Sequence, residues 1–379
     1  MRGFCGIDIQ EERTFFAFAY LKGKEFIPFY EFDFTSFKKA ALRDRIEEVE
    51  KEIKKQEMRH SFFAEKVYVG LPQEWERKKV FSDEVSLNKR RINKKVTFKD
   101  INLAKREIEN LALGWEEKVI HHFVLEYELG GKKYSSPPLG KEGRKLKLKS
   151  FLVFMNISLY EEVKNIFEDL GRRFMGFVYH PLCYVGLMKK ENLSGGVALI
   201  NIRKKETDCF VFLNQRLDFV GIIDFGEEKM IKGISEKLSL PPSLVSKTIY
   251  QFASFGEVDF SKEINIKNKN HYLVLSLHKL NSAMRELCKE GIEKAIKMVK
   301  TRLGEKSLGI VFTGRFTNIE NFSSFLKEAF PTLPISKFQF KNSSAFGCIR
   351  YSLFKFLEEN RIRKDNLFRK LIDIYKEYF

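Results

Sequence analysis

The stretch VALINIRKKETDCFVF, residues Val197–Phe212, predicts a β-hairpin. Its apolar runs have the spacing of a strand, a tight turn and a returning strand. Such a hairpin suits a loop that grips phosphate, provided that small residues let backbone N–H groups close on the phosphate oxygens. The turn here is Arg203-Lys204-Lys205-Glu206 and contains no glycine. The stretch therefore predicts a phosphate hairpin in shape and leaves open whether phosphate binds to it.

The pattern around this hairpin occurs twice in the chain. Residues 3–34 contain three short apolar runs with charged breaks, followed by a helical pattern and a buried strand. Residues 197–227 again contain three strands, followed by helical stretches at 228–254 and 278–303, a strand and a further helix. The repeated order predicts an internal duplication of a βββαβα core.

The region 83–171 has a different pattern. It contains a helix that begins near Thr97 or Asp100, two strands around a Gly-Gly turn, and a helix that ends at Gly171. A stretch of roughly 90 residues is within the usual size of a domain. We therefore predict an α/β protein with a duplicated core and an inserted α+β subdomain.

The bulk properties limit the class of protein. No apolar run approaches the length of a membrane-spanning helix, and acidic residues interrupt the N-terminus where a signal peptide would continue. The five cysteines form no CxxC pair, which predicts reduced thiols in a cytosol. The formal charge of +17 suits nucleic acid, anionic lipid or an acidic partner, and a basic genome composition explains it equally well.

The order of the elements resembles the actin-like ATPase superfamily, which includes sugar kinases and Hsp70. The segments that carry the resemblance are GIDIQEERTFFAFAY, ALINIRKKETDCFVF and GIVFTGRFTNIENF. The middle region resembles the inserted subdomain of FtsA, the bacterial cell-division protein. Pro138, Gly140, Gly143 and Leu146 fit the Pro-x-Gly-x-x-Gly-x-x-Leu turn of that subdomain. The resemblance spans the chain in element order and is specific over residues 67–200.

The resemblance implies an actin-like two-lobed fold with an FtsA-type insertion. In FtsA nomenclature the expected segments are 1–82 (1A), 83–171 (1C), 172–196 (return to 1A), 197–227 (2A), 228–305 (2B), 306–350 (return to 2A), 351–360 (closing helix) and 361–379 (amphipathic tail).

Members of the superfamily hold Mg-ATP between two domains on two glycine-rich hairpins. The resemblance places these residues at the equivalent cleft: Asp8, Gln10, Lys204, Lys205, Thr207, Gly314 and Arg315. Several of the family's residues are replaced. Glu11 and Glu12 follow the first strand and would repel a triphosphate, and Asn201 stands where an aspartate is expected. Arg315 and Phe316 follow Gly314 in place of a glycine that supports adenine.

Further departures are Ser246 and Ile249, which stand where the family's Glu and Lys contact the ribose and base, and Gly233, which stands where the family has an aspartate. We therefore expect no cofactor and no ATP hydrolysis. Two alternatives stay open: Lys204 and Lys205 grip phosphate by charge, so that ATP and magnesium bind weakly, or the chain is a divergent active ATPase.

The C-terminal residues 361–379 have the pattern of an amphipathic helix with six basic and three acidic side chains. The side chains expected to face a membrane are Leu367, Phe368, Arg369, Lys370, Leu371, Ile372, Tyr375 and Phe379. An apolar stripe beside basic residues suits the headgroup region of an anionic membrane. The alternative is a helix packed on its own domain or on another copy of the chain. FtsA-like proteins end in such a membrane anchor, which favours the membrane.

The resemblance further implies partners. We expect self-association, a peripheral location on the inner face of the cell membrane, and binding of the acidic tail of the tubulin-like FtsZ, with Lys262, Lys267 and Lys269 as candidate contacts. A pilus-type actin-like scaffold is the alternative. The basic run 87–99 has few aromatic residues, so we expect no nucleic-acid partner. The adjacent His121 and His122 point to opposite faces of a strand, so we expect no metal.

Overall fold

The computed structural model describes residues 2–9, 13–22, 25–35, 42–87, 95–188, 196–213, 216–256, 260–268, 271–303, 309–333 and 343–351. The chain forms two compact units. The first unit comprises Met1–Lys189 with Phe340–Phe379, and the second comprises Lys190–Gln339. All five cysteines are free and buried, in agreement with the reduced state expected from their spacing.

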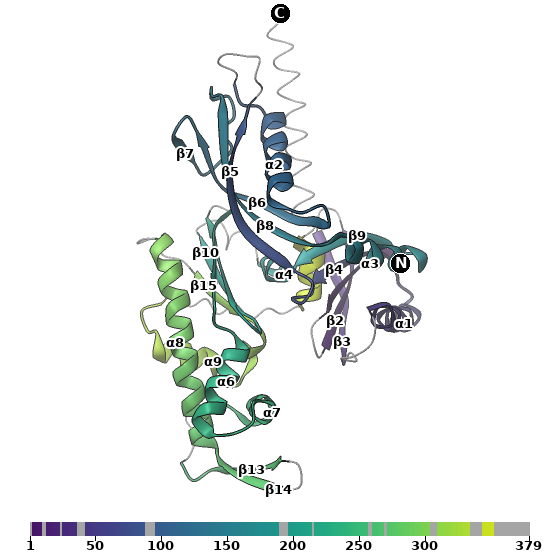
Figure 1. The fold of residues 1–379 in the computed structure, drawn as a ribbon. Coiled ribbons are helices and arrows are strands. Elements are labelled where there is room, and N and C mark those ends of the chain that lie inside the picture. Colours follow the sequence, from purple (N-terminus) through teal and green to yellow (C-terminus); the bar gives the residue numbers. More distant parts are fainter. Residues whose placement is uncertain are drawn as a thin grey trace, which may run out of the picture. The chain divides into compact units, whose positions relative to one another are not determined.

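The first unit contains a five-stranded sheet in the order β3-β2-β1-β4-β9 (Figure 1). Its strands are β1 (Arg2–Ile9), β2 (Arg13–Lys22), β3 (Glu25–Thr35), β4 (Phe63–Leu71) and β9 (Arg173–Tyr179). The meander β1–β2–β3 is antiparallel, whereas β4 pairs parallel with both β1 and β9. Helix α1 (Leu42–His60) connects β3 to β4 and places Ile46, Val49 and Ile53 in the core.

The second unit repeats this order in the sheet β12-β11-β10-β15. Its strands are β10 (Val197–Ile202), β11 (Thr207–Leu213), β12 (Arg216–Ile223) and β15 (Gly309–Thr313). Again three strands form an antiparallel meander and the fourth pairs parallel with the first. The helical elements are α6 (Glu227–Leu238), α7 (Pro242–Phe252), α8 (Leu277–Leu303), η1 (Arg315–Asn318) and α9 (Phe322–Ala329). The predicted duplication is present in the strand order.

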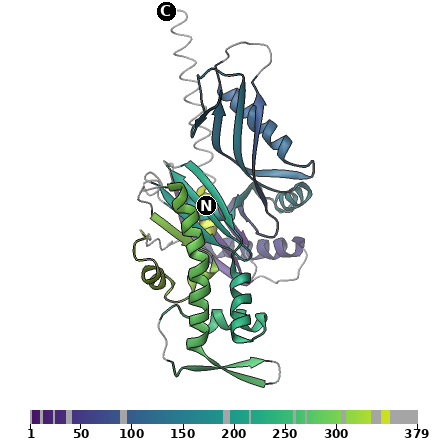
Figure 2. The ribbon, with the colours of Figure 1, turned by 60° about the vertical axis from the view of Figure 1, so that its left-hand side comes forward.

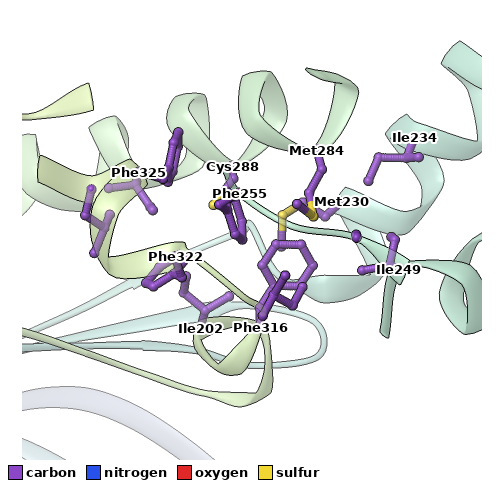
Figure 3. Packing of buried hydrophobic residues seen from close by; sticks show 14 of the residues in the cluster. Ile202, Met230, Ile234, Ile249, Phe255, Met284, Cys288, Phe316, Phe322 and Phe325 are labelled. Carbon is purple, nitrogen blue, oxygen red and sulfur yellow. The ribbon is translucent and has the colours of Figure 1, made fainter. Parts of the chain in front are cut away.

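Aromatic rings fill the core between the second sheet and its helices (Figure 3). Phe255 stacks on Phe325 with ring centroids 4.8 Å apart and meets Phe322 edge-on at 5.2 Å. Phe316, at the start of η1, approaches Phe255 edge-on at 5.7 Å. Because aromatic pairs add stability beyond the area that they bury, this cluster fixes the loop after β15 to Phe255, which follows α7, and through Phe255 to α9.

Two features of the second unit differ from the prediction. The helical stretch expected at 228–254 is two helices, because Pro241 and Pro242 end one helix and start the next. A hairpin of β13 (Glu263–Asn268) and β14 (His271–Ser276) precedes α8 and was not predicted. It lies beyond α6 and α7, at the end of the unit where α8 begins (Figure 2).

The inserted subdomain lies in the chain between β4 and β9 and has its own sheet, in the order β5-β8-β6-β7. Its elements are β5 (Arg77–Ser86), α2 (Phe98–Ala112), β6 (Glu117–Leu129), β7 (Lys132–Tyr134), β8 (Lys145–Asn156) and α3 (Ile157–Asp169). Helix α2 covers one face of this sheet (Figure 2). The expected boundary at residue 83 falls inside β5, whose mixed charges hide its strand pattern.

Local sequence signals explain the shape of this subdomain. Thr97 caps α2 in a capping box with Asp100, as its position predicted. Gly140 has a φ of +73°, which the glycine turn requires. Leu146, at the end of that turn, is fully buried under α2.

Residues 344–351 are helical and pack in the first unit, although the sequence placed residues up to 350 in the second. A Cβ on Gly6 would lie 1.9 Å from the carbonyl oxygen of Ala345, so β1 admits this helix only through a glycine. Gly347 packs against α4 (His180–Leu187) in the same way, since a Cβ on Gly347 would lie 2.0 Å from the Cys183 carbonyl oxygen. Ala17, Ala19 and Phe26 complete the contact.

No helix in the described part of the chain is long and apolar enough to cross a membrane. The predicted tail, 361–379, lies outside the described residues, as do Gln10, Lys269 and most of the basic run 87–99.

Candidate functional site: the two phosphate hairpins

The turn between β10 and β11 holds a buried ion pair. Nη1 of Arg203 lies 3.1 Å from Oδ2 of Asp208, with the two side chains 5% and 0% exposed. Arg203 stands where the superfamily's hairpin has a glycine. Its guanidinium therefore occupies the turn as a fixed cation. Asp208, at the start of β11, is the counter-ion that offsets the free-energy cost of burying this charge.

The backbone of this turn is bonded within the protein. The N–H of Arg203 donates to the carbonyl of Glu206 at 3.0 Å. The first amides of α6 close on the turn, because Glu227 N donates to Arg203 O at 2.9 Å and Glu228 N donates to Lys204 O at 2.8 Å. Gly226 allows this approach, since a Cβ there would lie 2.6 Å from Arg203 O. These three N–H groups, of the kind that cradles anions, already have acceptors inside the protein.

The neighbouring polar side chains are also engaged. The Thr207 hydroxyl donates to the carbonyl of Phe225 at 2.6 Å, so it continues the hairpin instead of facing a ligand. The Thr313 hydroxyl donates to Oδ1 of the fully buried Asn201 at 2.9 Å. Nδ2 of Asn201 has no hydrogen-bond partner among the described residues. Strand β10, on which the superfamily pattern places an acidic residue close to the metal, thus carries the buried amide of Asn201.

Arg315 lies against an aromatic ring at the loop after β15. Its guanidinium sits 3.7 Å from the ring centroid of Tyr250, and the Tyr250 hydroxyl donates to Oε2 of Glu227 at 2.7 Å. Gly314, with a φ of +114°, brings this loop against the backbone of Ile202. Gly314 therefore lies against the β10–β11 hairpin, whose turn carries Lys204 and Lys205, and Arg315 is connected through Tyr250 to the start of α6; the role of these residues in a nucleotide cleft stays a prediction.

Asp8, the candidate in the first unit, is 1% exposed and bound by its own unit. Its Oδ2 accepts a hydrogen bond from the Ser344 hydroxyl and lies 3.3 Å from Nε2 of His180. Glu31 Oε2 accepts from the N–H of Ser343 at 2.6 Å, which fixes the same segment of backbone. The Asp8 carboxylate therefore anchors the helical residues 344–351 to the sheet.

These contacts fit a bound Mg-ATP poorly. A phosphate at the second hairpin would have to displace the Arg203–Asp208 pair or the α6 amides from partners within 3.1 Å. A magnesium ion prefers carboxylate and water oxygens, and Asp8 already accepts from Ser344. Lys204 and Lys205 keep positive charge at the turn, where Lys204 Nζ lies 3.7 Å from Glu228.

The partners that decide this chemistry are not evident in the sequence. Asp208 matches the superfamily pattern together with Thr207 and also fits the continuation of a strand, but nothing in the sequence pairs it with Arg203, and Tyr250 stands next to Ile249, which aligns with the ribose and base site. Ser344 and His180 lie far from Asp8 in the sequence, so nothing local connects them. The composition of β11 could have drawn attention to Asp208, because this residue is a carboxylate within an otherwise apolar buried strand.

The two adjacent histidines have separate partners, as the strand geometry predicted. His121 Nε2 accepts from the N–H of Tyr179 at 3.0 Å. His122 lies under α2 with Nδ1 2.7 Å from Glu109 and Nε2 2.9 Å from the Ser150 hydroxyl. The series of contacts Glu109–His122–Ser150 resembles a catalytic triad. Ser150 is fully buried, however, so no substrate reaches its hydroxyl. No group of three metal-ligating side chains occurs among the described residues.

The candidate partner-binding lysines lie by the β13–β14 hairpin. Lys262 and Lys267 are exposed, and Lys267 pairs across the hairpin with Tyr272, which is 69% exposed. Val274 adds an exposed apolar side chain. This surface combines positive charge with apolar contacts.

No protein-family model matches this sequence, and no curated protein matches it. Solved structures are similar in fold. The PilM–PilN type IV pilus biogenesis complex has 9% identity and a TM-score of 0.59, covering 93% of this chain and 98% of that chain. A diol dehydratase-reactivating factor has 7% identity and a TM-score of 0.53, covering 95% and 100%. A glycerol dehydratase reactivase has 8% identity and a TM-score of 0.52, covering 92% and 99%. The chain has a two-lobed actin-like fold; the FtsA type of its insertion stays a prediction.

Proposed function

We propose that this actin-like chain is an assembly protein that binds partners and does not hydrolyse ATP. The observation that carries this proposal is the buried Arg203–Asp208 pair in the turn of the second phosphate hairpin. Catalysis of phosphoryl transfer depends on preorganised donors and a metal around the phosphates. At this hairpin the backbone N–H groups of Arg203, Glu227 and Glu228 already donate to carbonyl groups of the protein. The Arg203 guanidinium already has Asp208 as its counter-ion.

Within this class we propose an FtsA-like role in bacterial cell division. The chain would self-associate and tether FtsZ to the inner membrane from the cytoplasmic side, through the amphipathic tail at 361–379. Support comes from the glycine turn at Pro138–Leu146, the basic apolar pattern of the tail, and the net charge of +17. The exposed Lys262 and Lys267 beside Tyr272 suit an extended acidic peptide.

The nucleotide part of the proposal is tested by calorimetric titration of the full chain with ATP and magnesium, together with a phosphate-release assay. We expect no saturable magnesium-dependent binding and no release above the buffer rate. The double variant Arg203→Gly with Asp208→Asn removes the ion pair and places a glycine in the turn. It is measured in the same two assays for comparison. Tight ATP binding by the natural chain with ordinary magnesium dependence would contradict the proposal.

The membrane part is tested by sedimentation with liposomes of anionic and of neutral lipid. We expect the full chain to pellet with anionic liposomes regardless of ATP, and a chain ending at Asn360 to stay in the supernatant. Leu371→Glu with Ile372→Glu keeps the length of the tail and should also abolish pelleting, because it interrupts the apolar stripe. Pelleting of the shortened chain would show that the tail is not the anchor.

A pilus-type assembly scaffold is the second candidate. The observation that favours it is the likeness in fold to the PilM–PilN complex over 93% of this chain. Such a scaffold would bind a short segment of a membrane partner. Depletion in the source cell separates the two roles: loss of division supports the FtsZ tether, and loss of pili supports the scaffold. Capture of FtsZ by the full chain, weakened by Lys267→Glu, would favour the tether.

A further inference from the structure

Strand β5 forms one edge of the inserted sheet. It spans ten residues, Arg77–Ser86, and pairs along its whole length with β8. No strand among the described residues pairs with its other side (Figure 1). An edge strand presents unpaired N–H and C=O groups, so another chain can add to it.

Two other edge strands of this unit, β3 and β7, are protected against such pairing. Strand β3, an edge of the five-stranded sheet, carries Glu25, Glu31 and Asp33, no basic residue, and Pro28. Strand β7, the other edge of the inserted sheet, has three residues, of which two are lysines. Charge of one sign repels a second copy in any register, and a proline interrupts the ladder.

The charges of β5 are sorted by sign along the strand. Its sequence, RKKVFSDEVS, begins with three basic residues and has Asp83 and Glu84 near its end. When two copies of such a strand pair antiparallel, the basic start of each lies opposite the acidic end of the other. Opposite charges across a strand pair stabilise it, and like charges destabilise it.

Twofold symmetry limits the registers in which two copies of β5 can pair. A twofold axis between antiparallel edge strands is perpendicular to the sheet, so paired side chains share a face and the axis passes beside a residue paired with itself. With Phe81 at the axis, Lys79 lies opposite Asp83 of the second copy and Val80 lies opposite Ser82 of the second copy. With Ser82 at the axis, Phe81 would face Asp83 of the second copy, which pairs an aromatic ring with a charge. The register centred on Phe81 is therefore favoured.

The side chains of β5 are placed for this contact. Val80 is 45% exposed, and Phe81 is partly buried against the core under α2. Nζ of Lys79 donates a hydrogen bond to the carbonyl oxygen of Ala112 at the end of α2 and lies 5.4 Å from the Phe81 ring centroid, so its positive charge is held on the face that also carries Asp83. The Asp83 carboxylate accepts from the N–H of Glu84 at 2.7 Å and keeps its negative charge on that face. Lys78 does not contribute, because its side chain is 8% exposed and its Nζ lies 3.4 Å from the Tyr179 hydroxyl.

We propose that two copies of this chain associate through β5, antiparallel and centred on Phe81, so that their inserted sheets join into one continuous sheet. The contact needs neither nucleotide nor lipid. It adds to the proposed function a surface for self-association, and it stands or falls separately from the roles of the cleft and the tail.

The experiment is sedimentation equilibrium of the full chain at low salt without lipid, for the natural protein, for Lys79→Asp and for Asp83→Lys. We expect the natural chain to dimerise and each variant to dimerise roughly tenfold more weakly or worse, because both symmetric pairs become repulsive. An equal mixture of the two variants should regain the dimer, since each supplies the sign that the other needs. Lys133→Asp on β7 changes charge equally on the opposite edge and should leave dimerisation unchanged. Circular dichroism checks that each variant is folded.

Four results would overturn the proposal. The full chain could stay monomeric at every concentration, or dimerise equally well in both variants. The two variants could also fail to associate with each other although each is folded and monomeric. Dimerisation that appears only after removal of 361–379 would mean that the chain's own tail occupies the edge, and this too would overturn it.

Discussion

The β1–β2 hairpin of the first unit and the β10–β11 hairpin of the second hold equivalent places in the duplicated core, yet they treat their polar groups differently. The first keeps a carboxylate, Asp8, and uses it to bind the hydroxyl of Ser344. The second has lost its carboxylate to Asn201 and gained the ion pair of Arg203 with Asp208. In both halves, groups at positions that face a nucleotide in the superfamily stabilise the protein itself.

The two hairpins use their polar groups in different ways. In the first hairpin the Asp8 carboxylate binds a hydroxyl group of the same unit. In the second the turn itself carries a buried cation together with its counter-ion. The second arrangement gives a larger dependence of stability on single residues, because removal of one member leaves a buried charge.

Arg203→Ala should have the largest effect. It removes the guanidinium that faces the buried Asp208 carboxylate, and we expect a loss of about 3 kcal/mol in the free energy of unfolding, measured by urea denaturation. Asp208→Asn added to this variant should recover much of the loss. Arg302→Ala is the control, because its partner Asp218 lies 2.9 Å away at a more exposed site, where such pairs contribute at most about 1 kcal/mol. Equal losses for the two arginines would show that burial of the first pair has no consequence.

Asn201→Asp tests whether the second hairpin still accepts the carboxylate of the first. The site is fully buried, and this burial disfavours ionisation of the new carboxyl by more than the hydrogen bond from Thr313 favours it. We expect a loss of roughly 2 kcal/mol at neutral pH in urea denaturation. Because the folded-state pKa would lie above the unfolded value, the loss should shrink as the pH falls towards about 4. A variant as stable as the natural chain, or one that gains magnesium-dependent ATP binding, would contradict the interpretation that position 201 is part of the protein core and not of a ligand site.

Ser344→Ala tests the bond that Asp8 makes in the first hairpin. Loss of the hydroxyl removes one donor from a buried carboxylate, and we expect about 1 to 2 kcal/mol of destabilisation by chemical denaturation. Ser343→Ala is a matched control, because the Ser343 hydroxyl has no hydrogen-bond partner among the described residues. If the two substitutions have the same effect, the Asp8 contact contributes nothing.

His122→Gln sharpens the comparison with a polar cluster outside both hairpins. Burial lowers the pKa of His122 by more than its hydrogen bond with Glu109 raises it. Burial raises the pKa of Glu109, but the hydrogen bond and charge of His122 outweigh this and lower it. Both groups therefore stabilise the fold at neutral pH, and this contribution is lost as the pH falls below 6.5 for the histidine and further below 4.5 for the glutamate.

We expect the urea midpoint of the natural chain to fall by a small amount between pH 7 and pH 5.5, and by less in His122→Gln. His271→Gln, at an exposed position on β14, is the control and should keep the natural pH dependence. Identical curves for the natural chain and His122→Gln would contradict the assignment.

Much of the fold could be predicted because its signals are local. The short apolar runs of Val197–Ile202 and Thr207–Leu213, the Thr97 cap and the Gly-Gly turn each specify a backbone conformation within a few residues. Strand β5 was missed because its alternation is carried by charged side chains, whose periodicity a hydrophobic pattern does not reveal. The packing of 344–351 on the first unit was missed because Gly6 and Ala345 meet only through the fold.

The candidate site could be predicted in composition but not in its internal bonding. Missing glycines at Arg203 and Lys204 indicated a changed turn. The pairing of Arg203 with Asp208, and of Arg315 with Tyr250, depends on side-chain directions that a sequence does not show. A basic residue in a turn is usually solvated, and only the burial of both partners distinguishes Arg203 from Lys205.

The helical residues 344–351 also have a consequence for synthesis on the ribosome. They cover Ala17 and Ala19 and hold Asp8, yet they leave the ribosome after the whole second unit. Until then one face of the first sheet has apolar side chains without their final cover, which favours association with chaperones or other nascent chains. A message truncated anywhere in the second unit should therefore produce a fragment that aggregates or is degraded, even though it encodes every strand of the first sheet.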